Sequence, residues 1–278
     1  MAGLDKPVKR TISLAGLLLV LLLTLPFSHR LSAYAKQVAY GGAAGRNVIA
    51  DGGKVSVSLH EGDYLLFGHY LEEPILWRVL SSESGKPLLF SERVLCFKAF
   101  AACENPLEGL SVWQSSTLRQ WLNCAEAQVP WAGTPPEPAN IYEQRNGYVN
   151  EPGFLSSGNF SGAELARIED SGNRVFLLTR KQLQALPAAQ RQKSPTQAAL
   201  RHDDSPYITL RPACWYWTAD SIETNVHSVC SVTSKGGFYK SLASDGMNGV
   251  CPALYLSSVS VDSAGGDGSK GSPYILIG

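Results

Sequence analysis

The chain has 278 residues, of which 44% are hydrophobic and 17% charged, and this composition excludes a disordered or collagen-like protein. Lysine and arginine together equal aspartate and glutamate at 24 each, and beyond residues 1–35 the chain holds 20 basic and 23 acidic residues. Because nucleic-acid binding needs an excess of positive charge along the phosphate backbone, we expect no nucleic-acid partner.

The first 35 residues are typical of a secretory signal peptide. Three basic residues precede an apolar run over residues 12–27, and the segment closes in the small-x-small sequence Ala33-Tyr34-Ala35. The pattern predicts cleavage after Ala35. The alternative is an uncleaved membrane anchor, but a spanning helix usually needs roughly 20 apolar residues, more than this run supplies. We therefore expect a secreted protein or one on the extracytoplasmic cell surface, with membrane contact only through an uncleaved N-terminal segment.

The remaining chain divides into a lead-in and one predicted domain. Residues 36–54 are rich in Gly and Ala and predict a flexible lead-in. Residues 55–278 contain no later stretch that resembles a linker, and their length suits a single domain.

Alternating and β-rich segments predict that strands dominate this domain. Residues 55–59 alternate between apolar and polar side chains, and residues 64–70 and 75–81 are joined by a hairpin-like Leu71-Glu72-Glu73-Pro74. Further strands are predicted at residues 87–91, 174–178, 215–218, 226–233, 250–256 and 274–277.

Helices are predicted to be short and few. Ser115 or Ser116 can cap a helix that continues to about residue 126, and Thr179 with Gln182 has the spacing of a capping box. Another helix is expected after Pro195, and the Pro- and Gly-rich residues 127–160 predict surface loops. The fold class predicted is therefore α+β, with a mainly antiparallel sheet and short helices.

An even number of cysteines in an exported chain favours disulfide bridges over bound metal. The spacings are irregular and contain no C-x-x-C pair, which argues against zinc. The predicted disulfide cysteines are Cys96, Cys103, Cys124, Cys214, Cys230 and Cys251, of which Cys96 and Cys103 are near enough in sequence to close a short loop.

An ordered series of motifs resembles a large uncharacterised bacterial family, catalogued as a domain of unknown function, whose members are typically exported surface proteins. The motifs are Gly68-His69-Tyr70, residues 75–80 (ILWRVL), residues 113–123 (WQSSTLRQWLN), residues 175–179 (VFLLT), residues 249–254 (GVCPAL) and residues 266–274 (GDGSKGSPY). The resemblance spans roughly residues 55–278 and implies a fold similar to the C-type-lectin-like domains, including the formylglycine-generating-enzyme branch. A shared fold does not establish a shared function.

Two positions depart from that family. Relatives usually read Trp-x-Arg-Ser where this chain has Trp215-Tyr216-Trp217-Thr218, and Gly-Val-Arg-Pro-Ala-Leu where Cys251 stands. An anion site or ion pair built on those arginines would be missing here. The cysteine pair of the formylglycine branch cannot be placed on this sequence, so no oxidase activity is carried over.

The sequence lacks the common catalytic motifs. It has no G-x-S-x-G elbow, no P-loop and no H-E-x-x-H, and no dinucleotide-binding fingerprint follows a predicted strand. Residues 262–270 mix carboxylates with glycines without the order of a calcium loop, so calcium stays a weak alternative to the prediction of no metal and no cofactor. An unrecognised enzyme site could use His202, Asp203 or a carboxylate pair such as Glu72-Glu73 or Glu169-Asp170.

Aromatic side chains are the strongest indication of a binding site. On a strand, the first and third rings of residues 215–217 share one face, so exposed rings beside polar groups would suit a sugar or a peptide. The alternative is plain core packing. The predicted ligand-binding residues are Trp215, Tyr216, Trp217, Asp220, Asp245 and Asn248.

These observations predict a non-catalytic extracellular or surface-exposed module that binds carbohydrate, peptide or a surface partner protein. The alternatives are a secreted hydrolase or modifying enzyme with an unrecognised site, and a structural surface protein without a small ligand.

Overall fold

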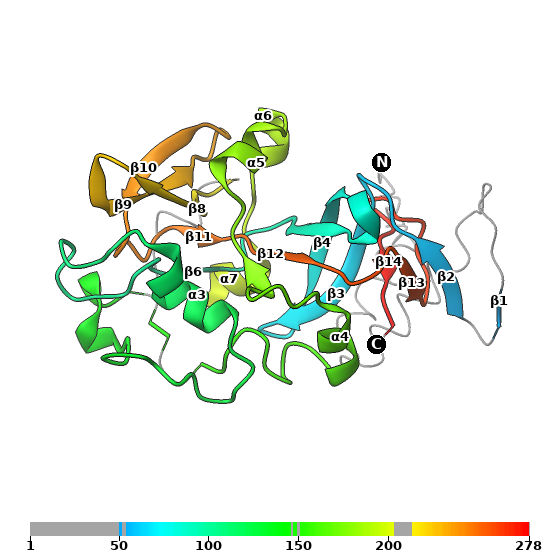
Figure 1. Ribbon diagram of the computed structural model, residues 1–278, viewed down its shortest axis with the longest axis horizontal. Helices are drawn as coiled ribbons and strands as arrows, with labels where there is room; N and C mark the ends of the chain where they lie inside the picture. The colour runs from blue at the N-terminus through cyan, green and yellow to red at the C-terminus, as the bar shows by residue number, and fades with distance from the viewer. Residues whose placement is uncertain (1–49, 52–53, 146, 149–150, 203–212, 278) are drawn as a thin grey trace, which may run out of the picture. The chain divides into compact units, whose positions relative to one another are not determined.

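The computed structural model describes residues 50–51, 54–145, 147–148, 151–202 and 213–277 (Figure 1). The predicted signal peptide and almost all of the predicted lead-in lie outside these described residues. The strands are β1 (Ala50–Asp51), β2 (Lys54–Ser58), β3 (Tyr64–Tyr70), β4 (Glu73–Ser81), β5 (Leu88–Ser91), β6 (Cys96–Phe97), β7 (Val175–Phe176), β8 (Tyr216–Ile222), β9 (Asn225–Val232), β10 (Phe238–Leu242), β11 (Gly249–Val250), β12 (Ala253–Tyr255), β13 (Ser260–Ser263) and β14 (Tyr274–Ile275).

The helices in the described residues are short, as predicted. The α-helices are α3 (Thr117–Leu122), α4 (Gly162–Arg167), α5 (Arg180–Gln184), α6 (Ala188–Arg191) and α7 (Gln197–His202), and single 3-10 turns lie at Glu83–Gly85, Trp113–Ser115, Pro138–Asn140 and Tyr142–Gln144. Ser116 caps α3 through its side chain, and Thr179 with Gln182 forms the predicted capping box of α5. The prediction of an α+β fold with mainly antiparallel pairing is confirmed.

The larger sheet has six strands in the order β14-β3-β4-β5-β12-β7, with only the β14–β3 pair parallel. The predicted hairpin joins β3 to β4 through Leu71 and Glu72, which both adopt positive φ angles. Two such residues are what a tight two-residue hairpin needs, although glycine or asparagine is the usual choice. Gly68 is required within β3, because a Cβ there would lie 2.1 Å from the Phe160 ring.

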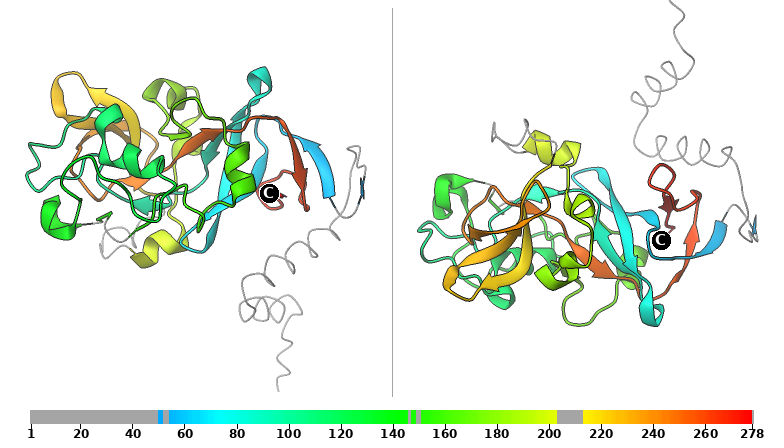
Figure 2. Two further views of the ribbon diagram at one scale, coloured as in Figure 1. Left: turned by 60° about the horizontal axis from the view of Figure 1, so that its bottom comes forward. Right: turned by 90° about the horizontal axis from the view of Figure 1, so that it is seen from above.

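A second sheet has five strands in the order β10-β9-β8-β11-β6, and a third has three strands in the order β1-β2-β13. In Figures 1 and 2, the chain passes from the five-stranded to the six-stranded sheet between β11 and β12. Residues 251–252 form this crossing, so the predicted strand over 250–256 is two short strands in different sheets.

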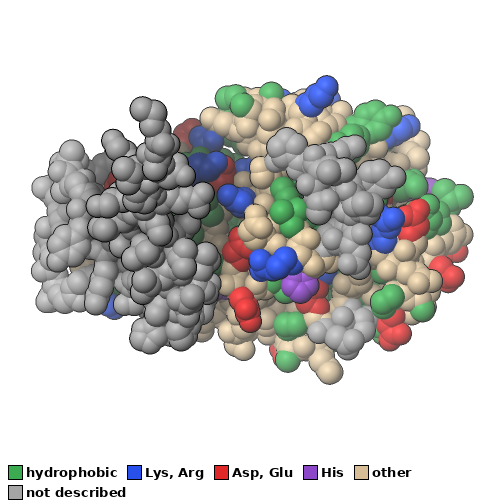
Figure 3. Space-filling model, turned by 180° about the vertical axis from the view of Figure 1, so that it is seen from behind, with side chains coloured by type: hydrophobic (Ala, Val, Ile, Leu, Met, Phe, Trp, Pro, Cys, Tyr) green, Lys and Arg blue, Asp and Glu red, His purple; other side chains and the backbone are tan. Residues whose placement is uncertain are grey.

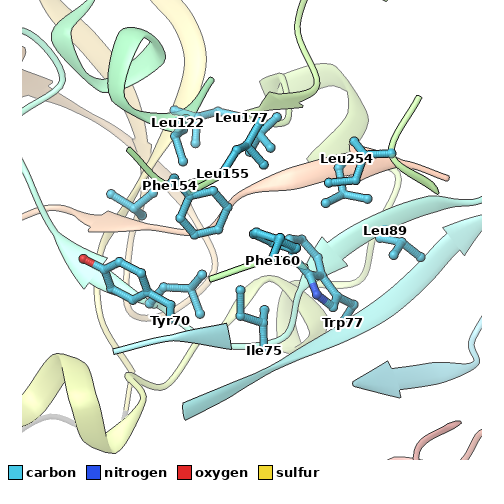
Figure 4. Packing of buried hydrophobic residues seen from close by; sticks show 14 of the residues in the cluster. Tyr70, Ile75, Trp77, Leu89, Leu122, Phe154, Leu155, Phe160, Leu177 and Leu254 are labelled. Carbon is cyan, nitrogen blue, oxygen red and sulfur yellow. The ribbon is translucent and has the colours of Figure 1, made fainter. Parts of the chain in front are cut away.

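The main core lies on one face of the six-stranded sheet. Figure 4 shows Tyr70, Ile75 and Trp77 from the sheet packed against residues of the loops and helix α3, among them Phe154 and Leu122. Residues 127–160, predicted as surface loops, contribute to this core. The described part of this range has no strand and no α-helix, but its side chains Tyr148, Phe154 and Phe160 are buried in the core.

A second core lies between the sheets and is covered by α5, which Figure 1 places beside β8. Its members include Phe90 from β5, Tyr216 from β8 and Leu183 from α5. Arg191 from α6 donates to the carbonyl oxygen of Gly236 at 2.7 Å and stacks on Phe238, which fixes α6 over the β9–β10 hairpin. Within the described ranges, no helix is long and apolar enough to cross a bilayer.

Candidate functional site

The second and third residues of the predicted aromatic triplet lie on opposite faces of β8, and both are buried. Tyr216 is 0% exposed and Trp217 is 1% exposed. The Trp217 indole N–H donates to the carbonyl oxygen of Lys98 at 2.8 Å, whereas the Tyr216 ring packs 6.2 Å from that of Phe90 in the second core. The expectation that one face of this strand stays at the surface is therefore wrong for Tyr216 and Trp217, and core packing describes them.

Trp215 is only partly buried and has an exposed aromatic neighbour. Its ring lies 5.6 Å from that of Tyr239 in an edge-on arrangement, and Tyr239 is 59% exposed. Strand β10, which carries Tyr239, was not predicted because its sequence FYKSL shows little apolar alternation. Sequence patterns therefore missed Tyr239, whose side chain is the more exposed of this aromatic pair.

Asp245 and Asn248 belong to a turn that lies beside Trp215. The Asn248 side-chain amide donates to Asp245 Oδ2 at 3.1 Å, and the Met247 N–H donates to Asp245 Oδ1 at 2.9 Å. The next residue, Gly249, donates its N–H to the carbonyl oxygen of Trp215 at 2.8 Å. The structure thus brings Trp215, Asp245 and Asn248 together.

Asp220 is not part of this group. It lies five residues beyond Trp215 along β8, roughly 16 Å at the usual rise of a strand. Its carboxylate accepts the backbone N–H of Arg180 at 2.5 Å, at the start of α5. This contact gives Asp220 a structural role at a helix end.

Three buried polar atoms around the 244–248 turn have no hydrogen-bond partner. They are Asn248 Oδ1, Ser244 Oγ and Arg145 Nη1. Asn248 is 2% exposed and Ser244 is 1% exposed, while the backbone of Arg145 lies against Gly246. We call Arg145, Ser244, Asp245 and Asn248 the polar turn. Since a buried polar atom without a partner costs about 1–3 kcal/mol, these three atoms mark the polar turn as a place where hydrogen bonding within the described residues is incomplete.

The carboxyl group of Asp245 is also shifted by its surroundings. Burial raises the pKa of Asp245, and the nearby Glu143 carboxylate raises it further, against the opposing effects of the Met247 N–H and Arg145. The polar turn combines one carboxyl, one amide, one hydroxyl and one guanidinium, whose Nε also pairs with Glu143 at 3.3 Å.

Next to the polar turn is a closed charged cluster that no sequence pattern indicated. Lys98 donates to Glu151 at 2.5 Å and to the carbonyl oxygen of Gly147 at 3.2 Å. Its ammonium lies 5.0 Å from the ring centre of Trp121 and 4.6 Å from that of Tyr148. The second Glu151 oxygen accepts from the hydroxyl of Tyr70 at 2.5 Å, so both charges are fully engaged. These partners are far apart in sequence, which is why sequence patterns missed the cluster.

The six cysteines, all within the described residues, form no disulfide bridge in this structure, which corrects the predicted bridges through Cys96, Cys103, Cys124, Cys214, Cys230 and Cys251. The proposed Cys96–Cys103 pair fails because the two side chains have different surroundings. Cys96 is buried in the main core, where burial raises its pKa to about 12, whereas the Cys103 thiol donates to the carbonyl oxygen of Asn105 at 3.2 Å.

The remaining candidates for chemistry do not converge. His202 is exposed at the end of α7, and Asp203 lies outside the described residues. Glu73 accepts the backbone N–H of Ala198, and Glu169 pairs with Lys86 at 2.6 Å. Among the described side chains, no three of the His, Cys, Asp and Glu type are arranged to hold a metal ion.

Comparison with known proteins places the chain in a family without naming a function. No curated protein and no solved structure matches it. Residues 84–258 match the family described as a domain of unknown function, DUF6273. The six-stranded sheet also takes β3, β4 and β14 from outside this range, so the folded unit extends beyond the matched residues. Because the match covers more than half of the chain, the protein belongs to the DUF6273 family.

Proposed function

We propose that the protein is a non-catalytic, exported binding module with a C-type-lectin-like fold, which recognises a carbohydrate, a peptide or a partner protein through the polar turn and the Trp215–Tyr239 pair. The observation that carries this proposal is the set of buried, unpartnered atoms on Arg145, Ser244 and Asn248. A ligand that supplied their missing hydrogen bonds would gain free energy that solvent does not already provide.

The chemistry of these groups favours a ligand that both donates and accepts hydrogen bonds. Arg145 Nη1 is a donor, Asn248 Oδ1 is an acceptor, and the Ser244 hydroxyl can act as either. Sugar hydroxyls and peptide amides both have this mixed character. The exposed ring of Tyr239 adds an apolar surface on which the flat face of a sugar or an aromatic side chain can pack.

Export is part of the proposal and rests on the N-terminal sequence alone. The basic, apolar and small-x-small order of residues 1–35 is the supporting observation. Protein recovered outside the cytoplasm should begin at Lys36 when its N-terminus is sequenced. Recovery of the intact chain from the cytosol would contradict this part of the proposal.

Arrays of oligosaccharides and of short peptides, probed with purified residues 36–278, test the binding function. For any compound that binds, we expect Asn248→Leu and Arg145→Gln to weaken affinity about tenfold or more, since each removes a buried polar contact. Tyr239→Ala should weaken it by a smaller factor. Leu107→Ala is the matched control, because Leu107 is 65% exposed and is no member of the polar turn.

Two results would contradict the proposed function. Binding that survives Asn248→Leu and Arg145→Gln would place the site elsewhere. Turnover of an arrayed compound that is lost in His202→Ala would instead support the enzyme alternative.

A further inference from the structure

A second group of charges lies on the face of the six-stranded sheet opposite the main core. The register places Tyr64, Arg78 and Phe90 opposite one another on β3, β4 and β5. Glu92 follows two residues after Phe90 and therefore points to the same side of the chain. We call Arg78, Glu92, Lys193 and Lys270 the cation cluster.

The carboxylate of Glu92 forms ion pairs with two lysines in this cluster. Glu92 Oε2 lies 3.2 Å from the ammonium of Lys193, and Glu92 Oε1 lies 2.6 Å from that of Lys270. The Lys193 side chain is 2% exposed and rests 4.4 Å from the ring centre of Phe90. The Lys270 side chain is 60% exposed, so the cluster is open to solvent on that side.

Arg78 has no carboxylate of its own among the described residues. Its guanidinium lies 5.9 Å from the ring centre of Tyr64, and its Nε is buried without a hydrogen-bond partner. The Lys270 ammonium lies 6.0 Å from the same ring centre. The Glu92 carboxylate thus pairs with two lysines, and Arg78 lies near Lys193, whose pKa its charge lowers.

The electrostatic effects agree with this excess of positive charge. Burial lowers the pKa of Lys193 and the Arg78 charge lowers it further, although Glu92 and Cys251 act in the opposite direction. Burial alone would raise the pKa of Glu92, but Lys193 and Lys270 hold it below its ordinary value. The nearest carboxylates on the adjoining loops have other contacts, since Asp63 accepts from the backbone of His60 and Asp267 from that of Ser269.

We propose that the cation cluster binds an oxyanion, meaning a carboxylate, phosphate or sulfate group of a ligand, between Arg78 and Lys270 above the buried Lys193. Arg78 is half-buried and has no carboxylate partner among the described residues, and a guanidinium offers the forked geometry that such groups accept. The bound anion would neutralise charge that Glu92 leaves uncompensated. This site is separate from the polar turn and does not depend on the proposed function.

The test measures the thermal unfolding midpoint of the protein in increasing millimolar sodium phosphate at constant ionic strength. Specific binding should raise the midpoint in proportion to the logarithm of the phosphate concentration, by about 3 °C when phosphate exceeds the dissociation constant roughly tenfold. Salts that act only through exclusion from the surface give a rise that is linear in concentration and independent of the residues of the cation cluster. Parallel titrations with sulfate and acetate show whether a tetrahedral or a planar oxyanion fits better.

Substitutions test whether the anion that raises the midpoint binds at the cation cluster. Arg78→Gln and Lys270→Gln should each abolish the logarithmic rise, and Arg78→Gln should unfold at the same or a higher midpoint in anion-free buffer because it removes a like charge near Lys193. Lys270 is exposed, so its variant also keeps the test informative if Arg78→Gln folds poorly. Lys86→Gln is the matched control, because Lys86 forms a one-to-one pair with Glu169 at 2.6 Å.

The proposal is overturned if wild-type protein shows only a rise that is linear in concentration with all three anions. It is equally overturned if the logarithmic rise persists in both Arg78→Gln and Lys270→Gln, or if Lys86→Gln abolishes it.

Discussion

Lys98 and Lys193 are both almost completely buried, both paired with a glutamate and both held against aromatic rings, yet their surroundings differ in one decisive way. The partner of Lys98 is Glu151, whose other oxygen accepts from the neutral hydroxyl of Tyr70. The partner of Lys193 is Glu92, whose other oxygen pairs with a second cation, Lys270. The charges of the first cluster cancel, whereas the second cluster carries a net positive charge.

This difference shows that the ion pair of a buried lysine does not by itself determine whether the cluster is electrically neutral. The partner of the second carboxylate oxygen determines it, because that partner is a neutral hydroxyl in one cluster and a cation in the other. A balanced pair within the core holds the loop around Gly147 and Glu151 in place. An unbalanced cluster with one exposed member can serve a ligand.

The largest effect is expected when the closed cluster loses its carboxylate. Glu151→Gln leaves Lys98 buried without a counter-charge, and we expect about 3–5 kcal/mol less free energy of unfolding. Urea or thermal unfolding measures this, and added phosphate should restore nothing. A loss below about 1 kcal/mol would mean that Lys98 has access to water.

Glu92→Gln should cost less, about 2–3 kcal/mol, because burial lowers the pKa of Lys193, which can therefore lose its proton when Glu92 is removed, and because Lys270 can turn into solvent. In contrast to Glu151→Gln, this variant should regain part of its stability in phosphate, since an added anion can replace the missing carboxylate. The same unfolding measurement, with and without phosphate, compares the two variants. Equal responses of both variants to phosphate would remove the distinction between the clusters.

The thiols beside the two clusters predict a common alkaline sensitivity. Burial raises the pKa of Cys96 to about 12 and raises that of Cys251 well above its ordinary value of 9.0. The unfolded chain therefore loses these protons first, so stability is complete below about pH 9 and falls as the pH rises. Each thiol should contribute a slope of about 1.4 kcal/mol per pH unit.

Cys96→Ala and Cys251→Ala should each reduce this slope by one thiol's contribution, whatever their effect on stability at neutral pH. Urea unfolding between about pH 8.5 and pH 9.5 measures it, where most tyrosines of the unfolded chain still keep their protons. An unchanged slope in either variant would show that the thiol reaches solvent in the folded protein.

The smallest effect is expected at the exposed Lys86–Glu169 pair. Both side chains reach solvent, so Glu169→Gln should change the free energy of unfolding by about 0–1 kcal/mol. A larger loss would imply that burial is not what separates this pair from those of Lys98 and Lys193.

Much of the fold could be predicted because its strands and helix starts depend on patterns of residues that are neighbours in the sequence. Strand β3 matches the predicted residues 64–70, and the capping residues Ser116 and Thr179 mark helix starts correctly. Helix α4 was missed, although Ser161 and Glu164 have the capping-box spacing that would have indicated it. Strands β10 and β13 were missed because they are short and polar, and their pairing depends on distant partners.

The charged clusters could not be predicted, because their members meet only through tertiary packing. Glu92 is 101 residues from Lys193 and 178 residues from Lys270. Among the predicted binding residues, the hydrogen bond from Gly249 to Trp215 places the backbone of Trp215 beside the end of the turn that carries Asp245 and Asn248. Sequence reasoning could not know that neighbouring elements cover both faces of β8 and bury Tyr216 and Trp217.

The pairing of β14 with β3 has a consequence for biosynthesis. Tyr274 lies beside Leu65, so one side of strand β3 is completed only after about 200 further residues have been synthesised. Pairings between such distant segments slow folding, and a strand with an unpaired edge can pair with other chains. During that interval the unpaired edge of β3 is a surface that chaperones can cover.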